Sequence, residues 1–273
     1  MDAWIKTGLV LVAMAVVGFV GSWEASGLFS VRGGIGPTIL QAQSPVSAVI
    51  SVVLTVAVAS IIGGFIGRVT TTATGMFILG FALFAMAMKL EGIEAFIYSE
   101  ANVKLLIVEA FCMSVLIFIA TKLVFAISGP LKDVRQSESE DKTSIWKTIF
   151  ISLSIIPIVY VVAITPMRGQ VIGAVAFGGV VIGFLARQFT PTLQPHIFYA
   201  LPIAAGGLGY FLGDMFSPIS DVAFVQGTVS SLLYPMPIEF ASGLIIGLSI
   251  GLGWAASLAE KQDDLQNPLK IDV

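Results

Sequence analysis

Charged side chains are scarce in this chain. Asp, Glu, Lys and Arg make up 11% of its 273 residues, whereas an ordinary globular domain carries about 25%. Hydrophobic residues make up 56%, and the mean hydropathy is +0.96. A water-soluble fold of this size has too large a surface to cover with so few charges. The composition therefore indicates an integral membrane protein whose main partner is the lipid bilayer.

Cysteine and histidine are nearly absent. Cys112 and His196 are the only residues of their kinds, so an intrachain disulfide and a cysteine-ligated or multi-histidine metal site are excluded. We therefore expect no cofactor and no metal. No paired acid and base motif is evident, which makes an enzyme the weakest of the functional classes. The net charge of −3 without a basic block also argues against nucleic acid as a partner.

Eight apolar runs are long enough to cross the hydrocarbon core, which takes about 20 helical residues. They predict an all-α membrane protein with eight transmembrane helices at 5–22, 46–67, 71–90, 103–127, 145–164, 171–187, 196–213 and 238–258. The first run, near Lys6, also has the form of a signal peptide. No A-x-A cleavage pattern follows it, so we expect this helix to be retained.

The distribution of Lys and Arg gives an orientation. With eight spans, ten of these residues fall on the side that holds both termini and four on the other side. The positive-inside rule then places both termini in the cytoplasm. The outer side carries a net charge of −4 and the inner side +1, which predicts an acidic outer mouth. The size of the chain and its lack of organelle signals favour a bacterial inner membrane.

The hydrophilic segment 129–144 divides the predicted spans four and four. It begins with a helix-stopping Gly-Pro pair and contains charges of both signs. We interpret it as a cytoplasmic linker between a first membrane half, 1–128, and a second, 145–258. Residues 259–273 are then a cytoplasmic tail.

A weak internal repeat supports this division. Residues 60–71 match residues 179–190 at a constant offset of 119, with a Gly-Phe pair, an arginine and a threonine in common positions. Because each half has an even number of spans, such halves are parallel and are related by an axis along the membrane normal. The matching arginines are Arg68 and Arg187. They either extend to the phosphates of the inner leaflet or form two symmetric contacts to an anion.

Glycines recur at four-residue spacing in two of the predicted helices. Gly209 and Gly213 lie in the seventh, and Gly243, Gly247 and Gly251 lie in the eighth. Such a stripe lets another helix backbone approach closely. We expect these two helices to pack against each other. The alternatives are an interface with a second copy or another membrane protein, or a channel-lining face.

Two acids are candidate transport residues. Glu109 lies about six residues into the fourth predicted helix and has no Lys or Arg three or four positions away. It is either a cation or proton site or an interfacial acid that pairs with water, Lys89 or Arg168. Asp214 follows the seventh predicted helix, where the helix dipole disfavours an acid. The sequence does not decide between these interpretations.

Two functional hypotheses follow. The first is a small transporter or channel-like permease for an ion or small solute, with its mouth on the acidic outer face. The second is a non-catalytic membrane anchor or scaffold subunit of a larger complex. The apolar outer loops 23–45 and 214–237 are suited to docking on a partner.

The topology is testable with reporter fusions. Fusions after residues 95 and 225 should report an external location, and fusions after residues 137 and 265 a cytoplasmic one. A paired alkaline phosphatase and fluorescent protein reporter measures both. A cytoplasmic report from residue 225 is incompatible with eight spans.

Overall fold

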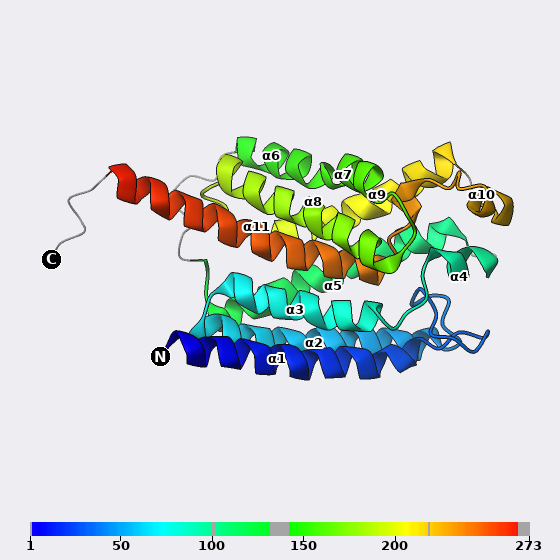
Figure 1. Ribbon diagram of the computed structural model, residues 1–273, viewed down its shortest axis with the longest axis horizontal. Coiled ribbons are helices and arrows are strands. Elements are labelled where there is room, and N and C mark those ends of the chain that lie inside the picture. Colours follow the sequence, from blue (N-terminus) through cyan, green and yellow to red (C-terminus); the bar gives the residue numbers. More distant parts are fainter. Residues whose placement is uncertain (1, 100–101, 132–141, 218, 267–273) are drawn as a thin grey trace.

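The computed structural model describes residues 2–99, 102–131, 142–217 and 219–266, and its regular elements in these ranges are helices joined by loops (Figure 1). The predicted all-α class is confirmed, since no strand occurs among the described residues. Most of the predicted linker 129–144 and the end of the tail lie outside the described residues. The α-helices are α1 Ala3–Glu24, α2 Pro45–Val69, α3 Thr72–Ala87, α4 Ile93–Tyr98, α5 Val103–Ser128, α6 Lys142–Leu153, α7 Ile155–Val162, α8 Arg168–Phe189, α9 Leu201–Phe216, α10 Asp221–Val225 and α11 Pro237–Gln266. Short 3-10 helices are η1 Ala25–Leu28, η2 Ile197–Tyr199 and η3 Ser231–Leu233.

Seven segments among the described residues have the length and hydropathy of membrane spans, where the sequence predicts eight. They are Ala3–Leu28, Pro45–Val69, Val103–Ser128, Ile145–Val162, Arg168–Phe189, Ile197–Phe216 and Pro237–Ala259. The predicted third span is the shorter helix α3, which has 16 residues. At ~1.5 Å per residue it is about 24 Å long, less than the ~30 Å hydrocarbon core. It ends early because residues 88–90 form tight turns, with the N–H of Lys89 bonded to the carbonyl of Met86.

The fifth predicted span is divided into α6 and α7. Pro157 has no backbone N–H, and its ring collides with the carbonyl four residues earlier in a regular helix. That carbonyl belongs to Leu153, where α6 ends. The helical path resumes at Ile155 after a turn at Ser154. The two helices together still cover a span of 18 residues.

The helices form two groups with α11 between them (Figure 1). Helices α1, α2 and α3 lie on one side of α11, and α6, α7, α8 and α9 lie on the other. The start of α1 and the last turns of α11 lie at one end of the molecule, which we name the terminal end. Helices α4 and α10 and the loops 29–44 and 217–236 lie at the opposite end, which we name the loop end.

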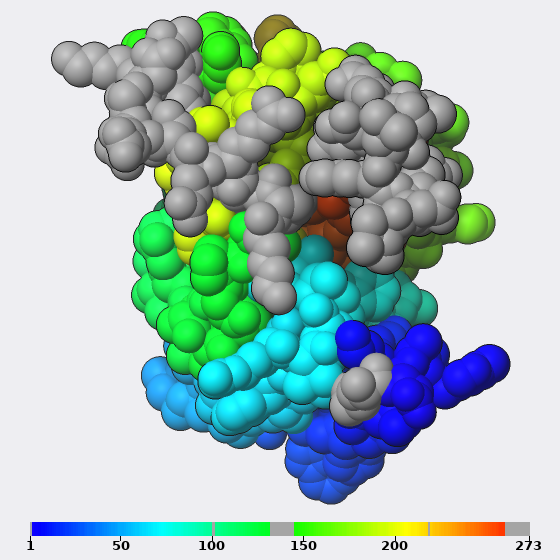
Figure 2. All heavy atoms as spheres, turned by 90° about the vertical axis from the view of Figure 1, so that its left-hand side faces the viewer, coloured from blue at the N-terminus to red at the C-terminus, as the bar shows by residue number. Residues whose placement is uncertain are grey.

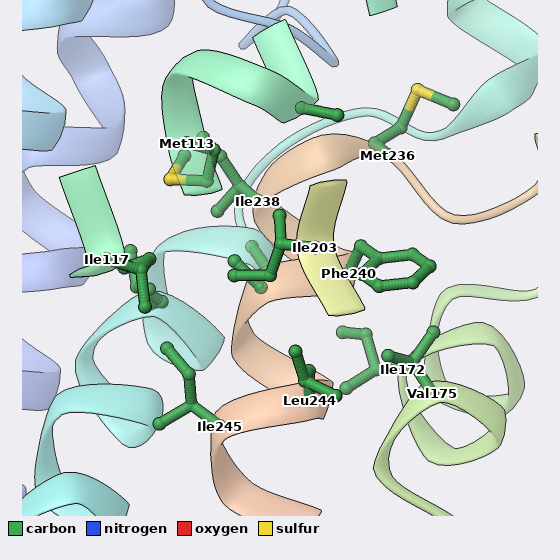
Figure 3. Packing of buried hydrophobic residues seen from close by; sticks show 14 of the residues in the cluster. Met113, Ile117, Ile172, Val175, Ile203, Met236, Ile238, Phe240, Leu244 and Ile245 are labelled. Carbon is green, nitrogen blue, oxygen red and sulfur yellow. The ribbon is translucent and has the colours of Figure 1, made fainter. Parts of the chain in front are cut away.

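Helix α11 is the centre of the apolar core. Figure 3 shows Ile117 of α5, Ile203 of α9 and Val175 of α8 around Leu244 and Ile245 of α11. All five side chains are buried. By contrast, α1 exposes a row of large apolar side chains, as expected of a helix that faces lipid: Trp4, Leu9, Leu11, Val12, Val16, Phe19 and Trp23.

The glycines of α11 pack against α8. A Cβ on Gly243 would lie 2.6 Å from the carbonyl oxygen of Ile172, and a Cβ on Gly247 would overlap the carbonyl of Ala176. Gly251 meets the carbonyl of Val180 in the same way. The expectation that this stripe faces the seventh predicted helix, α9, is wrong.

The close approach is reciprocal because α8 has its own glycines. A Cβ on Gly179 would lie 2.6 Å from the carbonyl oxygen of Leu244, and one on Gly183 would lie 2.8 Å from that of Leu248. Two backbones that meet in this way gain dispersion contacts that bulkier residues prevent. The glycine stripe is therefore an intramolecular interface.

The glycines of α9 face a loop. Gly213 lies against the side chain of Leu233 in η3, and the nearest atom to a Cβ on Gly209 would be a methyl of Leu232 at 3.9 Å. The absence of side chains at these glycines thus leaves space for η3, not for another transmembrane helix.

Two glycines of α11 allow a matched test of the packing. Gly247→Ala should destabilise the detergent-solubilised protein by about 2 kcal/mol, because the added methyl group overlaps the backbone of α8. Gly253→Ala should be neutral or stabilising by up to about 1 kcal/mol, since no atom lies within 4 Å of its Cβ and alanine favours the helix. Thermal unfolding midpoints measure both changes. Equal midpoints for the two variants would contradict the observed contact.

Candidate functional site

Glu109 is buried inside the helix bundle, with only 3% of its surface exposed. It belongs to α5, which begins after Asn102, whose side-chain oxygen accepts a hydrogen bond from the N–H of Lys104 at 2.9 Å. Six residues further along, at ~1.5 Å each, Glu109 lies about 9 Å below the start of the helix. Its depth in the bundle is therefore that expected from the sequence.

The carboxylate of Glu109 binds the backbone of loop 29–44. The N–H of Ile39 donates to both of its oxygens, at 3.1 and 3.0 Å, and the N–H of Leu40 donates to Oε2 at 3.3 Å. A carboxylate has two acceptor oxygens and no donor, so it matches a pair of converging N–H groups. The described residues place no lysine or arginine within ion-pair distance of Glu109. The alternative of a pair with Lys89 or Arg168 is therefore wrong.

Loop 29–44 folds inward to reach Glu109. Residues 36–39 are buried although they form no helix. The N–H of Gly36 bonds to the carbonyl of Leu28 at 2.7 Å, and the N–H of Gln43 bonds to that of Phe29 at 2.7 Å. These bonds close the loop at its base, while Pro37 presents no N–H that would need a partner. Non-helical backbone at this depth is tolerated because protein, rather than lipid, surrounds it.

A second buried carboxylate, Glu239, lies in the first turn of α11 and is 2% exposed. It accepts a hydrogen bond from the N–H of Met236 at 2.9 Å, as the glutamate of a capping box does. Its Oε1 lies 3.4 Å from Nε of Arg168, close enough for an ion pair, although the two groups are not aligned as a hydrogen bond. Arg168 also donates to the carbonyl of Met88 at 2.8 Å.

Tyr210 of α9 lies near both acids, close enough for electrostatic interaction with Glu109 and Glu239. Its side chain is buried, and its hydroxyl donates to the carbonyl of Pro235 at 2.6 Å. The loop end thus holds a polar cluster of the buried residues Glu109, Glu239 and Tyr210 with the partly exposed Arg168.

Asp214 is not part of this cluster. It lies inside the last turn of α9, which continues to Phe216, and not beyond the helix as expected. It is partly exposed. Two cavities lie at opposite ends of the described part of the chain, and neither Asp214 nor Glu109 lines either of them.

The larger of these cavities has a volume of about 720 Å³ and lies at the loop end. It is bounded by Tyr160 of α7, Phe216 of α9 and the segment 228–234. Among the described residues, no group of three or more His, Cys, Asp and Glu side chains has the arrangement of a metal site.

Arg68 and Arg187 line the other cavity, at the terminal end, with a volume of about 390 Å³. The sequence repeat marked both residues, and the structure brings them to one concave site. The role of loop 29–44 as the partner of Glu109 was not predicted from the sequence. Its only advance indication was an apolar loop of unusual length.

Comparisons of the chain with protein-family models, with curated proteins and with solved structures find no match. The composition and the seven candidate spans are those of a polytopic membrane protein. The arrangement of its buried groups is the basis for any more specific function.

The hold of Glu109 on loop 29–44 is testable by hydrogen exchange. Glu109→Gln replaces one acceptor oxygen with an NH₂ donor, so it should accelerate exchange in peptides that cover residues 29–44 by about tenfold or more. Mass spectrometry of the detergent-solubilised protein measures this rate. Glu94→Gln, which neutralises an exposed acid at the same end, is the control. Unchanged exchange in the Glu109 variant would show that the loop is held by other contacts.

Proposed function

We propose that the protein is a small permease for protons or another cation, with Glu109 as the residue that binds the transported ion. The observation that carries this proposal is a buried carboxylate whose charge, among the described residues, is met only by the backbone N–H groups of Ile39 and Leu40. An acid in the apolar interior of a membrane protein is costly and is characteristic of ion pathways.

In the proposed mechanism, the transported ion replaces the backbone N–H groups of Ile39 and Leu40 as the partner of Glu109. A proton or cation that binds the carboxylate removes the negative charge to which the two N–H groups are bonded. Loop 29–44 is then released, and an order–disorder change in a loop is a common form of gate. Ion binding and opening at the loop end are coupled in this way.

A two-half architecture is part of the proposal, with residues 1–128 and 145–258 as the halves. Its support is a pattern of helix contacts. Helix α2 packs on α5 and α8 packs on α11, which pairs the second span with the fourth in each set. The fourth helix of each set also packs on the third helix of the other, α5 on α9 and α11 on α3. The correspondence is incomplete, because α3 packs closely on α2 whereas α9 makes no comparable contact with α8.

The alternative function is a non-catalytic membrane anchor or scaffold subunit. One observation favours it: Glu109 lines neither of the two cavities described above, and its carboxylate is bonded to the backbone of loop 29–44, which is a structural role in the conformation observed. A scaffold requires a partner membrane protein and moves no ion. Homo-oligomerisation is compatible with either function.

Flux in reconstituted vesicles tests the proposal. Wild-type protein in phosphatidylcholine vesicles with an imposed membrane potential should move protons, Na⁺ or K⁺ faster than empty vesicles do. Glu109→Gln should reduce that flux by about tenfold or more at near-normal protein yield, because the amide does not bind a cation as a carboxylate does. A pH-sensitive dye and ion-selective dyes inside the vesicles measure each ion.

Glu94→Gln is the matched control and should transport like the wild type. Absence of flux from the wild-type protein with every ion, together with a stable hetero-complex in native mass measurements, would support the scaffold. Equal flux in the wild type and the Glu109 variant would remove Glu109 from the transport path.

A further inference from the structure

The cavity at the terminal end is built by segments that are distant in the sequence. Its wall is formed by the end of α2, the start of α3, the end of α5, the last turn of α8 and residues 252–257 of α11. Figure 2 shows this end of the molecule, with the connection between α2 and α3 next to the end of α5. Its volume of about 390 Å³ falls within the ~300–1,000 Å³ typical of small-molecule sites.

Two guanidinium groups give the cavity its charge. Arg68 lies in the last turn of α2, and Arg187 lies in the last turn of α8. Each position is favourable for a cation because the C-terminus of a helix is negative. Both arginines line the same cavity, while none of the described residues of its wall is acidic. The described residues of the wall thus supply two positive charges, the kind of charge that a bound anion requires.

The start of α3 adds backbone donors. Thr71 caps this helix, and its hydroxyl oxygen accepts a hydrogen bond from the N–H of Thr74 at 3.2 Å. The N–H groups of Thr72 and Ala73, in the first turn, have no carbonyl partner within the helix. Both residues line the cavity. A helix N-terminus that faces two arginines across a concave site is suited to an anion with several oxygens.

The wall is fixed by a chain of hydrogen bonds between α5 and α3. Ser128 Oγ donates to Oγ1 of Thr72 at 3.1 Å, and that hydroxyl bonds to the carbonyl of Gly129 at 2.9 Å. These bonds hold the start of α3 against the end of α5 without any ligand. The donors of the site are thus positioned in advance, which reduces the entropic cost of binding.

We propose that this cavity binds a phosphate group through Arg68, Arg187 and the first-turn N–H groups of α3. The phosphate belongs either to a soluble phosphate or to a phosphatidic acid headgroup. Both present pairs of phosphate oxygens, and a guanidinium group binds such a pair in a bidentate manner. The proposal is independent of ion transport through Glu109, which lies at the opposite end of the molecule.

Binding of two probes to the full-length protein tests the site. The first probe is radiolabelled inorganic phosphate, applied to protein in neutral detergent at constant ionic strength. The second is phosphatidic acid in phosphatidylcholine nanodiscs, with retained lipid counted by native mass spectrometry. Arg68→Gln and Arg187→Gln should each weaken binding of whichever probe the wild-type protein binds. The expected loss is about tenfold, the effect of one charge-assisted hydrogen bond. Lys147→Gln, at an exposed position of α6, controls for the loss of one positive charge and should bind normally.

Gly253→Leu provides a test that leaves both arginines in place. Gly253 lines the cavity, and no atom lies within 4 Å of its Cβ. A leucine there should occupy the cavity, leave the fold intact and weaken binding by about tenfold or more, the size of effect expected when a ligand loses a charge-assisted contact. Gly8→Leu adds the same side chain to an equally open position of α1 and should have no effect.

The two probes distinguish the source of the phosphate. Saturable binding of inorganic phosphate that both Arg68→Gln and Gly253→Leu weaken identifies a soluble ligand. The same dependence for phosphatidic acid alone identifies a headgroup. If neither probe binds, or if binding is the same in the wild type and these two variants, the proposal is wrong.

Discussion

Every backbone N–H group inside the bilayer needs a protein acceptor, because no water is present to supply one. Helices satisfy this requirement within themselves, which is why the described residues fold almost entirely into helices. Backbone N–H groups outside the helices need acceptors of another kind. Glu109 accepts from Ile39 and Leu40 of an inward loop, and Glu239 accepts from Met236 just before α11. Buried acids thus take the place of helical carbonyls at the loop end.

The second constraint is that apolar side chains alone do not draw helices together in lipid, since lipid tails are equally apolar. Close backbone contact supplies the attraction instead. Helices α8 and α11 meet through Gly179 and Gly183 on one side and Gly243, Gly247 and Gly251 on the other. The same device joins α2 to α3, where a Cβ on Gly63 or Gly75 would overlap the backbone of the other helix. Helix α11 is therefore fixed to α8, while its opposite side packs on α3.

Composition and the length of apolar runs were sufficient to predict an all-helical membrane protein. The count of spans was less predictable, because the run 71–90 contains enough apolar residues for a span but its helix ends at Ala87. The glycine stripe of α11 predicted close approach but did not identify the partner. The complementary spacing of Gly179 and Gly183 is the signal that points to α8.

The candidate site was predictable only in part, for a physical reason. Glu109 stands out in a sequence because an acid in an apolar run is costly. Its partners do not, since a backbone N–H is present at every residue except proline and those of Ile39 and Leu40 lie about 70 positions away. The sequence does relate Arg68 to Arg187, because both occupy the same position of the repeated motif. Their convergence on one cavity still depended on the packing of α2, α5, α8 and α11.

Three of the charges at the two ends follow the directions of their helices. Glu239 lies in the first turn of α11, where the positive helix N-terminus favours an acid. Arg68 and Arg187 lie in the last turns of α2 and α8, where the negative C-terminus favours a cation. Glu109 lies deeper in α5 and is met by backbone N–H groups instead. Helix α5 packs on α2 and α11 packs on α8, so each acid-bearing helix has an arginine-bearing neighbour.

An apolar layer separates these two sites. Met113 and Ile117 of α5 face Leu244 and Ile245 of α11 in this layer (Figure 3), and all four side chains are buried. In the proposed permease an ion therefore crosses only when α5 and α11 separate here. Because the glycines of α11 are in backbone contact with α8, α8 and α11 must move together. A motion that rocks α8 and α11 as one unit preserves these contacts, but it must also shift the interface of α11 with α3, where a Cβ on Gly80 would lie 3.0 Å from the backbone N of Ile246.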